Sequence, residues 1–188
     1  MVGLGYKIDY ELIKKILISI EPSDSTFLPG LNIFNHKKGR IYKKFDKLPE
    51  LDILIFLEQG SIDTIQFNQR TTLKNYNKKK ENLVKKALTQ VGKGLELKNK
   101  KLLGQGVNYS SKAHQDIISR PYLDFLIDKI DGYKGAYGIN IAHSGKLMGV
   151  FVEPEQTFSN LIEEIESVGE LDFFQRVKLI SGGIELLE

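Results

Sequence analysis

The chain has 188 residues, of which 41% are hydrophobic and 27% charged, and these values are typical of a globular protein rather than a disordered one. The absence of cysteine excludes disulfides, a thiolate nucleophile and cysteine-ligated zinc. The first residues lack the pattern of a signal peptide, and no apolar run approaches the roughly 20 residues that span a membrane. We therefore expect a cytoplasmic protein without a membrane partner.

Lysine is unevenly distributed along the chain, although the formal net charge is only +3. Residues 71–101 contain ten lysines and two glutamates, whereas the segment from Glu153 onward is acidic. A basic stripe can attract nucleic acid or small anions. These lysines lie between apolar residues in a helical pattern, without arginine among them. We interpret them as a solvated helix face and expect no nucleic-acid partner.

The first predicted element is an amphipathic helix at residues 9–20. Asp9 is its expected cap, and Pro22 ends it because proline cannot continue the helical hydrogen-bond pattern. Its expected buried face is apolar and consists of Leu12, Ile13, Ile16 and Ile20. Residues 31–35 and 40–45 predict two strands joined by a lysine-rich turn. A single helix cannot bury its apolar face alone, so we expect it to pack on this hairpin, on another chain or on sequence that is absent.

The run Leu51–Leu57 is almost entirely apolar and predicts a central strand. The elements expected after it are helices at 74–97, 99–118 and 121–130, hairpin strands at 136–143 and 146–153, a helix at 158–168 and a strand at 173–180. This order predicts an α+β fold, in which helices pack on one face of an antiparallel sheet. With Pro49 near the boundary, we expect the remnant of an N-terminal domain (a helix, a loop and a hairpin) at 1–48. A complete α+β domain is expected at 49–188.

The segment Glu21–Thr26 is the strongest candidate for a functional site, because it places several short polar side chains beside a predicted strand. Asp24 is the candidate catalytic residue, a carboxylate that accepts a hydrogen bond from a substrate hydroxyl. Its polar neighbours, the candidate substrate-binding residues of this loop, are Ser23, Ser25 and Thr26. The alternative is that these residues only form a turn or cap a helix end, as short polar side chains often do.

A second candidate is the turn His143-Ser144-Gly145 between two apolar strands. Gly145 allows a positive φ and a close approach of backbone N–H groups to a ligand, and adjacent N–H groups can hold an anion. A plain hairpin turn explains the same residues. Ser181-Gly-Gly183 is a weaker signal, which we interpret as a loop or bulge. The three histidines of the chain are scattered without paired spacing, so no metal site is predicted.

Five blocks of sequence point together to one family. They are Glu21-Pro-Ser-Asp-Ser-Thr26, Leu31-Asn-Ile-Phe-Asn-His36, Leu51–Leu57, Tyr137-Gly-Ile-Asn-Ile-Ala-His-Ser-Gly145 and Ser181-Gly-Gly-Ile-Glu-Leu186. In this order they resemble the GHMP small-molecule kinases, and among them the branch of L-threonine kinases of cobalamin biosynthesis and propanediol utilisation. The resemblance runs from about residue 4 to residue 186, and its specificity depends on the Glu-Pro-Ser-Asp-Ser-Thr and Ala-His-Ser-Gly blocks together.

The resemblance implies transfer of the γ-phosphoryl group of ATP, with Mg, to the hydroxyl of a small hydroxy amino acid, L-threonine giving O-phospho-L-threonine. It implies that Asp24 orients or deprotonates this hydroxyl. Orientation is the role we expect, because a carboxylate with a pKa of about 4 is a weak base for an alcohol. It also implies that the acceptor pocket is lined by Ser23, Ser25 and Thr26. The third, glycine-containing motif of the family corresponds to His143, Ser144 and Gly145.

The phosphate loop of the family, Pro-x3-Gly-Leu-Gly-Ser-Ser, has no counterpart in this sequence. Gly3-Leu-Gly5 lacks the two serines and the helix start that hold phosphates. We therefore expect the nucleotide-binding half to be absent and the chain alone to be inactive without it. The expected partners are a separate N-terminal half, or a second copy of this chain in a homodimer that covers the apolar surface which the absent half would bury. The alternative is a non-catalytic metabolite-binding or interaction module that kept the kinase fold.

Overall fold

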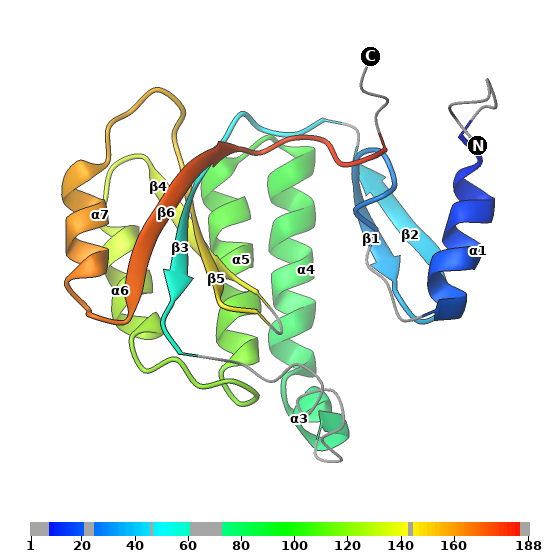
Figure 1. The fold of residues 1–188 in the computed structure, drawn as a ribbon, viewed down its shortest axis with the longest axis horizontal. Coiled ribbons are helices and arrows are strands. Elements are labelled where there is room, and N and C mark those ends of the chain that lie inside the picture. The colour runs from blue at the N-terminus through cyan, green and yellow to red at the C-terminus, as the bar shows by residue number, and fades with distance from the viewer. Residues whose placement is uncertain (1–7, 21–24, 46, 61–72, 143–144, 185–188) are drawn as a thin grey trace. The chain divides into compact units, whose positions relative to one another are not determined.

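The computed structural model describes residues 8–20, 25–45, 47–60, 73–142 and 145–184 (Figure 1). The chain divides into two compact units, the first formed by residues 1–48 and 180–188 and the second by residues 49–179. The last segment of the chain thus returns to the unit that contains the first segment. Each unit is described by itself below.

Unit 1 contains the helix α1 (Tyr10–Ile20) and the antiparallel strands β1 (Leu31–Asn35) and β2 (Arg40–Phe45), as the sequence predicts. Asp9 caps α1, because its carboxylate accepts hydrogen bonds from the backbone N–H groups of Glu11 and Leu12 at 3.1 and 3.0 Å. The hairpin turns at Gly39, where a φ of +62° favours glycine.

Three of the four residues expected on the apolar face of α1 are exposed within this chain, whereas Ile13 is half-buried. Leu12, Ile16 and Ile20 are 40%, 46% and 74% exposed, and no residue of the helix is fully buried. Another side of the helix approaches the hairpin, because a Cβ atom added at Gly39 would lie 2.3 Å from Cδ1 of Ile18. The helix has apolar residues on more than one side, so its periodicity alone does not determine which side packs.

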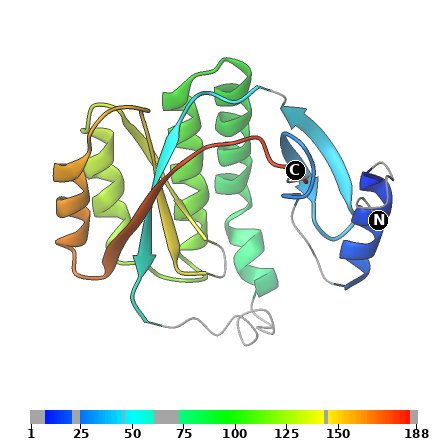
Figure 2. The same ribbon diagram turned by 45° about the horizontal axis from the view of Figure 1, so that its top comes forward.

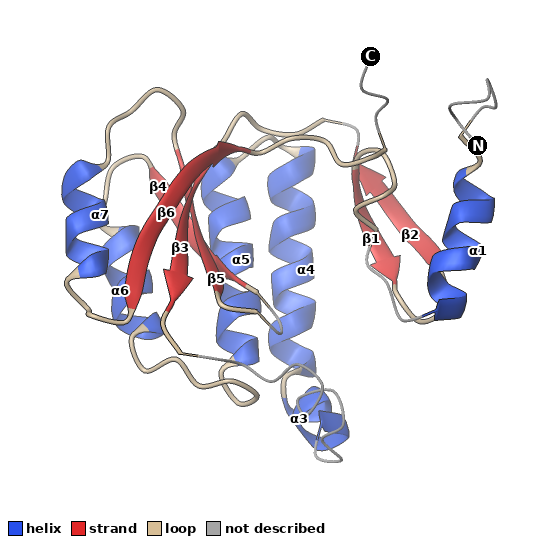
Figure 3. Cartoon of the chain, viewed as in Figure 1, coloured by secondary structure: helices blue, strands red, loops and turns tan. Residues whose placement is uncertain are grey.

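Unit 2 is built on a four-stranded sheet, drawn in red among the helices of this unit (Figure 3). The strands are antiparallel and their order is β4-β5-β3-β6. Its elements are β3 (Asp52–Glu58), α3 (Leu73–Lys79), α4 (Glu81–Glu96), α5 (Lys100–His114), α6 (Leu123–Asp131), β4 (Ala136–Ile141), β5 (Leu147–Val152), α7 (Ser159–Glu166) and β6 (Leu171–Lys178). Strand β3 lies in the interior of the sheet, as its apolar sequence predicts. The single helix expected at 74–97 is wrong, because the helix is divided at Lys80.

The main core of unit 2 lies between the sheet and the helices α6 and α7, which stand together beside the strands (Figure 2). Leu126 of α6 and Leu161 of α7 are fully buried against sheet residues such as Phe56. Replacing such a leucine with alanine typically costs about 2–5 kcal/mol, so this core provides much of the stability of the unit. The predicted α+β class with an antiparallel sheet is confirmed.

Helix α5 covers the outer edge of β4. The backbone N–H of Ile139 donates to Oδ1 of Asn108 at 2.7 Å, and Oγ of Ser111 donates to the carbonyl of the same residue at 2.7 Å. Gly104 lies directly against the backbone of Tyr137, where a Cβ atom would be only 1.8 Å from the carbonyl oxygen. These contacts satisfy an edge strand that would otherwise be open to pairing, and they hold the β4–β5 hairpin that leads to Gly145.

Among the residues that the structure describes, none belongs to a helix with the length and apolar character needed to cross a membrane.

Candidate functional site

The predicted acceptor loop is described from Ser25 onward and forms a tight turn in unit 1. The backbone N–H of Leu28 donates to the carbonyl of Ser25 at 2.9 Å, which closes the turn. Phe27 and Leu28 are buried, whereas Thr26 is exposed. The loop therefore has an apolar base and presents at least one hydroxyl side chain to solvent, as a pocket for a polar ligand requires.

Four of the predicted site residues lie outside the described part of the chain, namely Ser23, Asp24, His143 and Ser144. The described ones are Ser25, Thr26 and Gly145. Ser25 and Thr26 share the turn of unit 1, and Gly145 belongs to unit 2. The role of each of these residues stays a prediction.

Gly145 lies in the turn that precedes β5. The positive φ and the anion-holding role expected for this turn stay predictions. Space restricts this position, because a Cβ atom at Gly145 would lie 3.3 Å from Cβ of Ala142. A larger residue therefore requires this neighbour to move.

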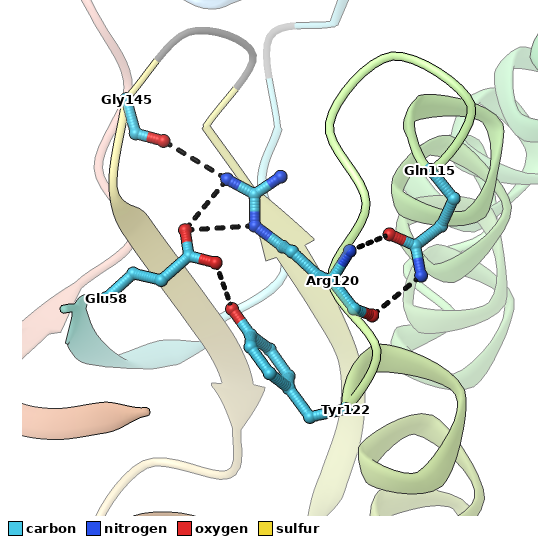
Figure 4. Close-up of polar contacts among 5 residues, drawn as sticks. All are labelled: Glu58, Gln115, Arg120, Tyr122 and Gly145. Carbon is cyan, nitrogen blue, oxygen red and sulfur yellow. Dashed lines mark hydrogen bonds and ion pairs between the residues drawn. The ribbon is translucent and has the colours of Figure 1, made fainter. Parts of the chain in front are cut away.

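A buried arginine holds the carbonyl of Gly145 (Figure 4). Nη2 of Arg120 donates to this carbonyl at 3.2 Å and also contacts Oε2 of Glu58 at 2.9 Å, while Nε donates to the same carboxylate oxygen at 3.0 Å. The side chain of Arg120 is 1% exposed and that of Glu58 15%. Two buried charges therefore neutralise each other next to a predicted site residue, and the guanidinium fixes the position of Gly145.

Two further residues complete this cluster, which we call the Arg120 cluster (Glu58, Gln115, Arg120, Tyr122 and Gly145). The Tyr122 hydroxyl donates to Oε1 of Glu58, and the side-chain amide of Gln115 bonds the backbone of Arg120 at both its N–H and its carbonyl, each at 2.8 Å (Figure 4). Burial, and then the neighbouring Glu58 carboxylate, raise the pKa of the Tyr122 hydroxyl. The hydroxyl therefore stays protonated and remains a donor.

No local pattern in the sequence marks Glu58, Arg120 or Tyr122. The signal that the sequence does contain is the rarity of arginine, because the chain has four arginines among its 27 basic residues. An arginine in a chain that otherwise uses lysine suggests a planar partner. Among the described arginines, Arg120 pairs with the Glu58 carboxylate and Arg176 with the Asp52 carboxylate at 2.7 Å.

Three helix starts among the described residues do not fit the phosphates of ATP. Asp9 caps α1, Glu81 lies in the first turn of α4, and Asn99 caps α5 with its side-chain oxygen, so these helix starts are already occupied by acidic or accepting groups. No three histidine, aspartate or glutamate side chains gather around a common point within the described ranges. A hollow of about 560 Å³ is lined by Asn75, Tyr76, Lys78 and Lys79, but it lacks a glycine-rich loop.

Comparison with known proteins shows similarity along almost the whole chain. No family model matches the sequence. L-threonine kinase of Citrobacter freundii is 23% identical over 187 residues, which are 97% of this chain and 64% of that protein. L-threonine kinase of Salmonella typhimurium is 22% identical over 187 residues, with 97% and 62% covered. The chain thus spans slightly less than two thirds of the length of these curated relatives.

Among solved structures, phosphomevalonate kinase of Streptococcus pneumoniae, in complex with phosphomevalonate and AMPPNP, has a similar fold. The TM-score is 0.55 at 14% identity, and the match covers 74% of this chain and 43% of that one. The similarity in sequence to L-threonine kinases and the similarity in fold to a phosphomevalonate kinase both agree with the resemblance to the GHMP small-molecule kinases, over part of their length.

Proposed function

We propose that this chain is the acceptor-binding portion of an ATP-dependent kinase that phosphorylates the hydroxyl of a small metabolite, with L-threonine as the leading acceptor. The observation that carries the proposal is the similarity to two L-threonine kinases across 97% of the chain. The AMPPNP bound to the phosphomevalonate kinase of similar fold supports ATP as the phosphoryl donor. The product would be O-phospho-L-threonine.

The contribution of this chain to the reaction is to bind and orient the acceptor. In the proposed site Asp24 accepts a hydrogen bond from the threonine hydroxyl and directs its oxygen toward the phosphoryl group. The other acceptor contacts come from Ser23, Ser25 and Thr26, and those near the third motif from His143, Ser144 and Gly145. Phosphoryl transfer depends mainly on positioning and on neutralisation of charge, so a correctly held hydroxyl is a substantial part of catalysis.

The nucleotide is the part of the proposed reaction that the described residues do not explain. ATP, with Mg, supplies the phosphoryl group when bound. Since the described residues offer neither a phosphate loop nor a carboxylate cluster for the metal, we assign no residue of this chain to it. We infer that L-threonine binds this chain more strongly than Mg-ATP does.

Calorimetric titration of the chain with L-threonine and, separately, with Mg-ATP tests the proposal. We expect L-threonine to bind and Asp24→Asn to weaken this binding, because the amide replaces the accepting carboxylate without a change of shape. Asp124→Asn is the matched control, since Asp124 is a surface carboxylate that is 68% exposed. Absence of L-threonine binding, or equal weakening by both variants, would contradict the proposed acceptor site.

An assay for phosphothreonine distinguishes the kinase from a module that only binds metabolites. The chain is incubated with L-threonine and Mg-ATP, alone and with an extract of the source organism. Phosphothreonine that forms only when a further component is present supports a kinase that this chain completes. Binding of L-threonine without product under every condition supports the non-catalytic module instead.

A further inference from the structure

Residues 181–183 pack against the acceptor turn, although about 150 residues separate the two segments in sequence. The backbone N–H of Gly30 donates to Oγ of Ser181 at 3.0 Å. In the opposite direction, the backbone N–H of Gly183 donates to the carbonyl of Thr26 at 3.0 Å. Both segments belong to unit 1. The two hydrogen bonds attach both ends of the turn 26–30 to the same short segment.

The two glycines of this segment lie close to the backbone of the turn. A Cβ atom at Gly182 would lie 3.2 Å from the carbonyl oxygen of Thr26 and 3.4 Å from that of Leu28. A Cβ atom at Gly183 would lie 3.3 Å from Cα of Pro29, and its φ of +136° is also unfavourable for residues with a side chain. The backbone of the segment therefore lies directly on the backbone of the turn, with no side chain between them.

The contact fixes the turn through its backbone. Phe27 and Leu28 are buried, so they form the apolar base of the turn, and Leu28 N–H closes it onto the Ser25 carbonyl. The bond from Gly183 uses the main-chain carbonyl of Thr26 and does not require its side-chain hydroxyl. Ser25 and Thr26 are thus held by their backbone, next in sequence to Asp24.

We propose that Ser181, Gly182 and Gly183 are positioning residues for the hydroxy amino acid acceptor, because they hold the turn that carries Ser25 and Thr26. This inference rests on the proposed function. The segment contacts the backbone of the turn rather than the acceptor. The segment already restricts the conformations of the turn before the acceptor binds, so less conformational entropy is lost on binding. Preorganisation of this kind raises affinity without adding a ligand contact.

Three variants of the full chain test the proposal. Ser181→Ala removes the acceptor for the N–H of Gly30, and Ser181→Thr keeps a hydroxyl at the same position. Ser167→Ala is the matched control, because Oγ of Ser167 donates to the carbonyl of Glu164 at 2.7 Å within unit 2. Each variant is measured for amide hydrogen exchange at Gly30 and Gly183, for the dissociation constant of L-threonine, and for thermal unfolding.

We expect Ser181→Ala to accelerate exchange at Gly30 and to raise the dissociation constant of L-threonine about three- to ten-fold, the range that loss of one hydrogen bond produces. Ser181→Thr should restore both values, and Ser167→Ala should change neither. Unfolding that remains cooperative in Ser181→Ala shows that the effect is local.

The possible failures are distinguishable. If exchange accelerates but L-threonine binds Ser181→Ala as tightly as the wild type, the segment is only structural and the positioning role is wrong. If exchange is unchanged, the contact itself does not hold the turn, and the proposal is also wrong. If the wild-type chain binds no L-threonine, the proposed function fails, and the acceptor role of this segment fails with it.

Discussion

The two turns that contain predicted site residues are held in different ways. The turn of unit 1 is held by neutral groups. The N–H of Gly30 donates to the hydroxyl oxygen of Ser181, and the carbonyl of Thr26 accepts from the N–H of Gly183. In unit 2, Gly145 is held by a charged group, the guanidinium of Arg120, whose own charge is compensated by Glu58. Both arrangements bring residues that are distant in sequence to a predicted site.

This difference predicts how the stability of each turn responds to mutation and to pH. A neutral hydrogen bond contributes about 0.5–1.5 kcal/mol, and its loss has a local effect. A buried ion pair contributes little in net terms, but removal of one partner leaves an uncompensated charge at a cost of about 3–5 kcal/mol. We therefore expect the Gly145 turn to be more sensitive to mutation and to pH than the turn of unit 1.

The largest effect is expected for Glu58→Gln. Arg120 cannot lose its proton, so a charge that is 1% exposed would remain without its counterion. The free energy of unfolding of unit 2 should fall by about 3–5 kcal/mol in urea denaturation. Glu81→Gln, in an exposed pair with Lys85, is the control and should cost at most about 0.5 kcal/mol. Similar small decreases in the free energy of unfolding for both variants would show that the ion pair does not dominate the stability of the Arg120 cluster.

An intermediate effect is expected for Gly183→Ala, which places a side chain at a φ of +136° and against Pro29. The free energy of local opening of the unit 1 turn, read from amide exchange at Leu28 and Gly30, should fall by about 2 kcal/mol. Gly169→Ala also has a positive φ, +80°, but its Cβ atom would contact nothing within 4 Å. It should leave exchange in the unit 1 turn unchanged, and an equal effect of both variants would refute a specific contact.

The smallest effect is expected for Tyr122→Phe, which removes one hydrogen bond to the Glu58 carboxylate. The free energy of unfolding of unit 2 should fall by about 1.5 kcal/mol at pH 8. The raised pKa of Tyr122 gives this effect a pH dependence. In the unfolded chain the Tyr122 hydroxyl ionises near pH 10, whereas in the folded protein it stays protonated at higher pH. Its contribution to the free energy of unfolding is therefore complete below about pH 10 and is lost progressively as the pH rises above this value. Urea denaturation at several pH values between 8 and 11 should show the advantage of the wild type shrinking above pH 10.

The turn of unit 1 serves as the control for the pH dependence of Tyr122→Phe. The bond between Gly30 and Ser181 involves no titratable group, so the stability difference between the wild type and Ser181→Ala should stay constant from pH 8 to 11. If the difference for Tyr122→Phe is equally constant, the hydroxyl of Tyr122 ionises in the fold as it does in the unfolded chain.

Local elements of this protein are well predicted from the sequence because their signals are local. The cap at Asp9, the strands β1 and β2, and the apolar strand β3 each depend on residues that are close together in the chain. The α+β class follows from the order of these elements. The division of the helix at Lys80 was not predicted, because neither glycine nor proline marks it.

The contacts around the two turns were not predictable in the same way, because they join distant residues. Arg120 meets a carboxylate that is 62 positions away in sequence, and Gly30 meets a hydroxyl that is 151 positions away. Composition and periodicity describe which face of an element is apolar, but not which elements become neighbours. The interpretation of Ser181-Gly-Gly183 as a loop was therefore too limited, since its small residues allow a backbone contact that only the fold creates.

The return of residues 180–183 to unit 1 has a consequence for the order in which the protein forms during translation. Domains usually fold as units as they leave the ribosome, with the N-terminal one first. Here unit 1 needs contacts from residues that are synthesised after the whole of unit 2, residues 49–179. Unit 2 can therefore complete its core while unit 1 still lacks Ser181 and Gly183, so residues 25–45 are synthesised before unit 2 but reach their final form after it.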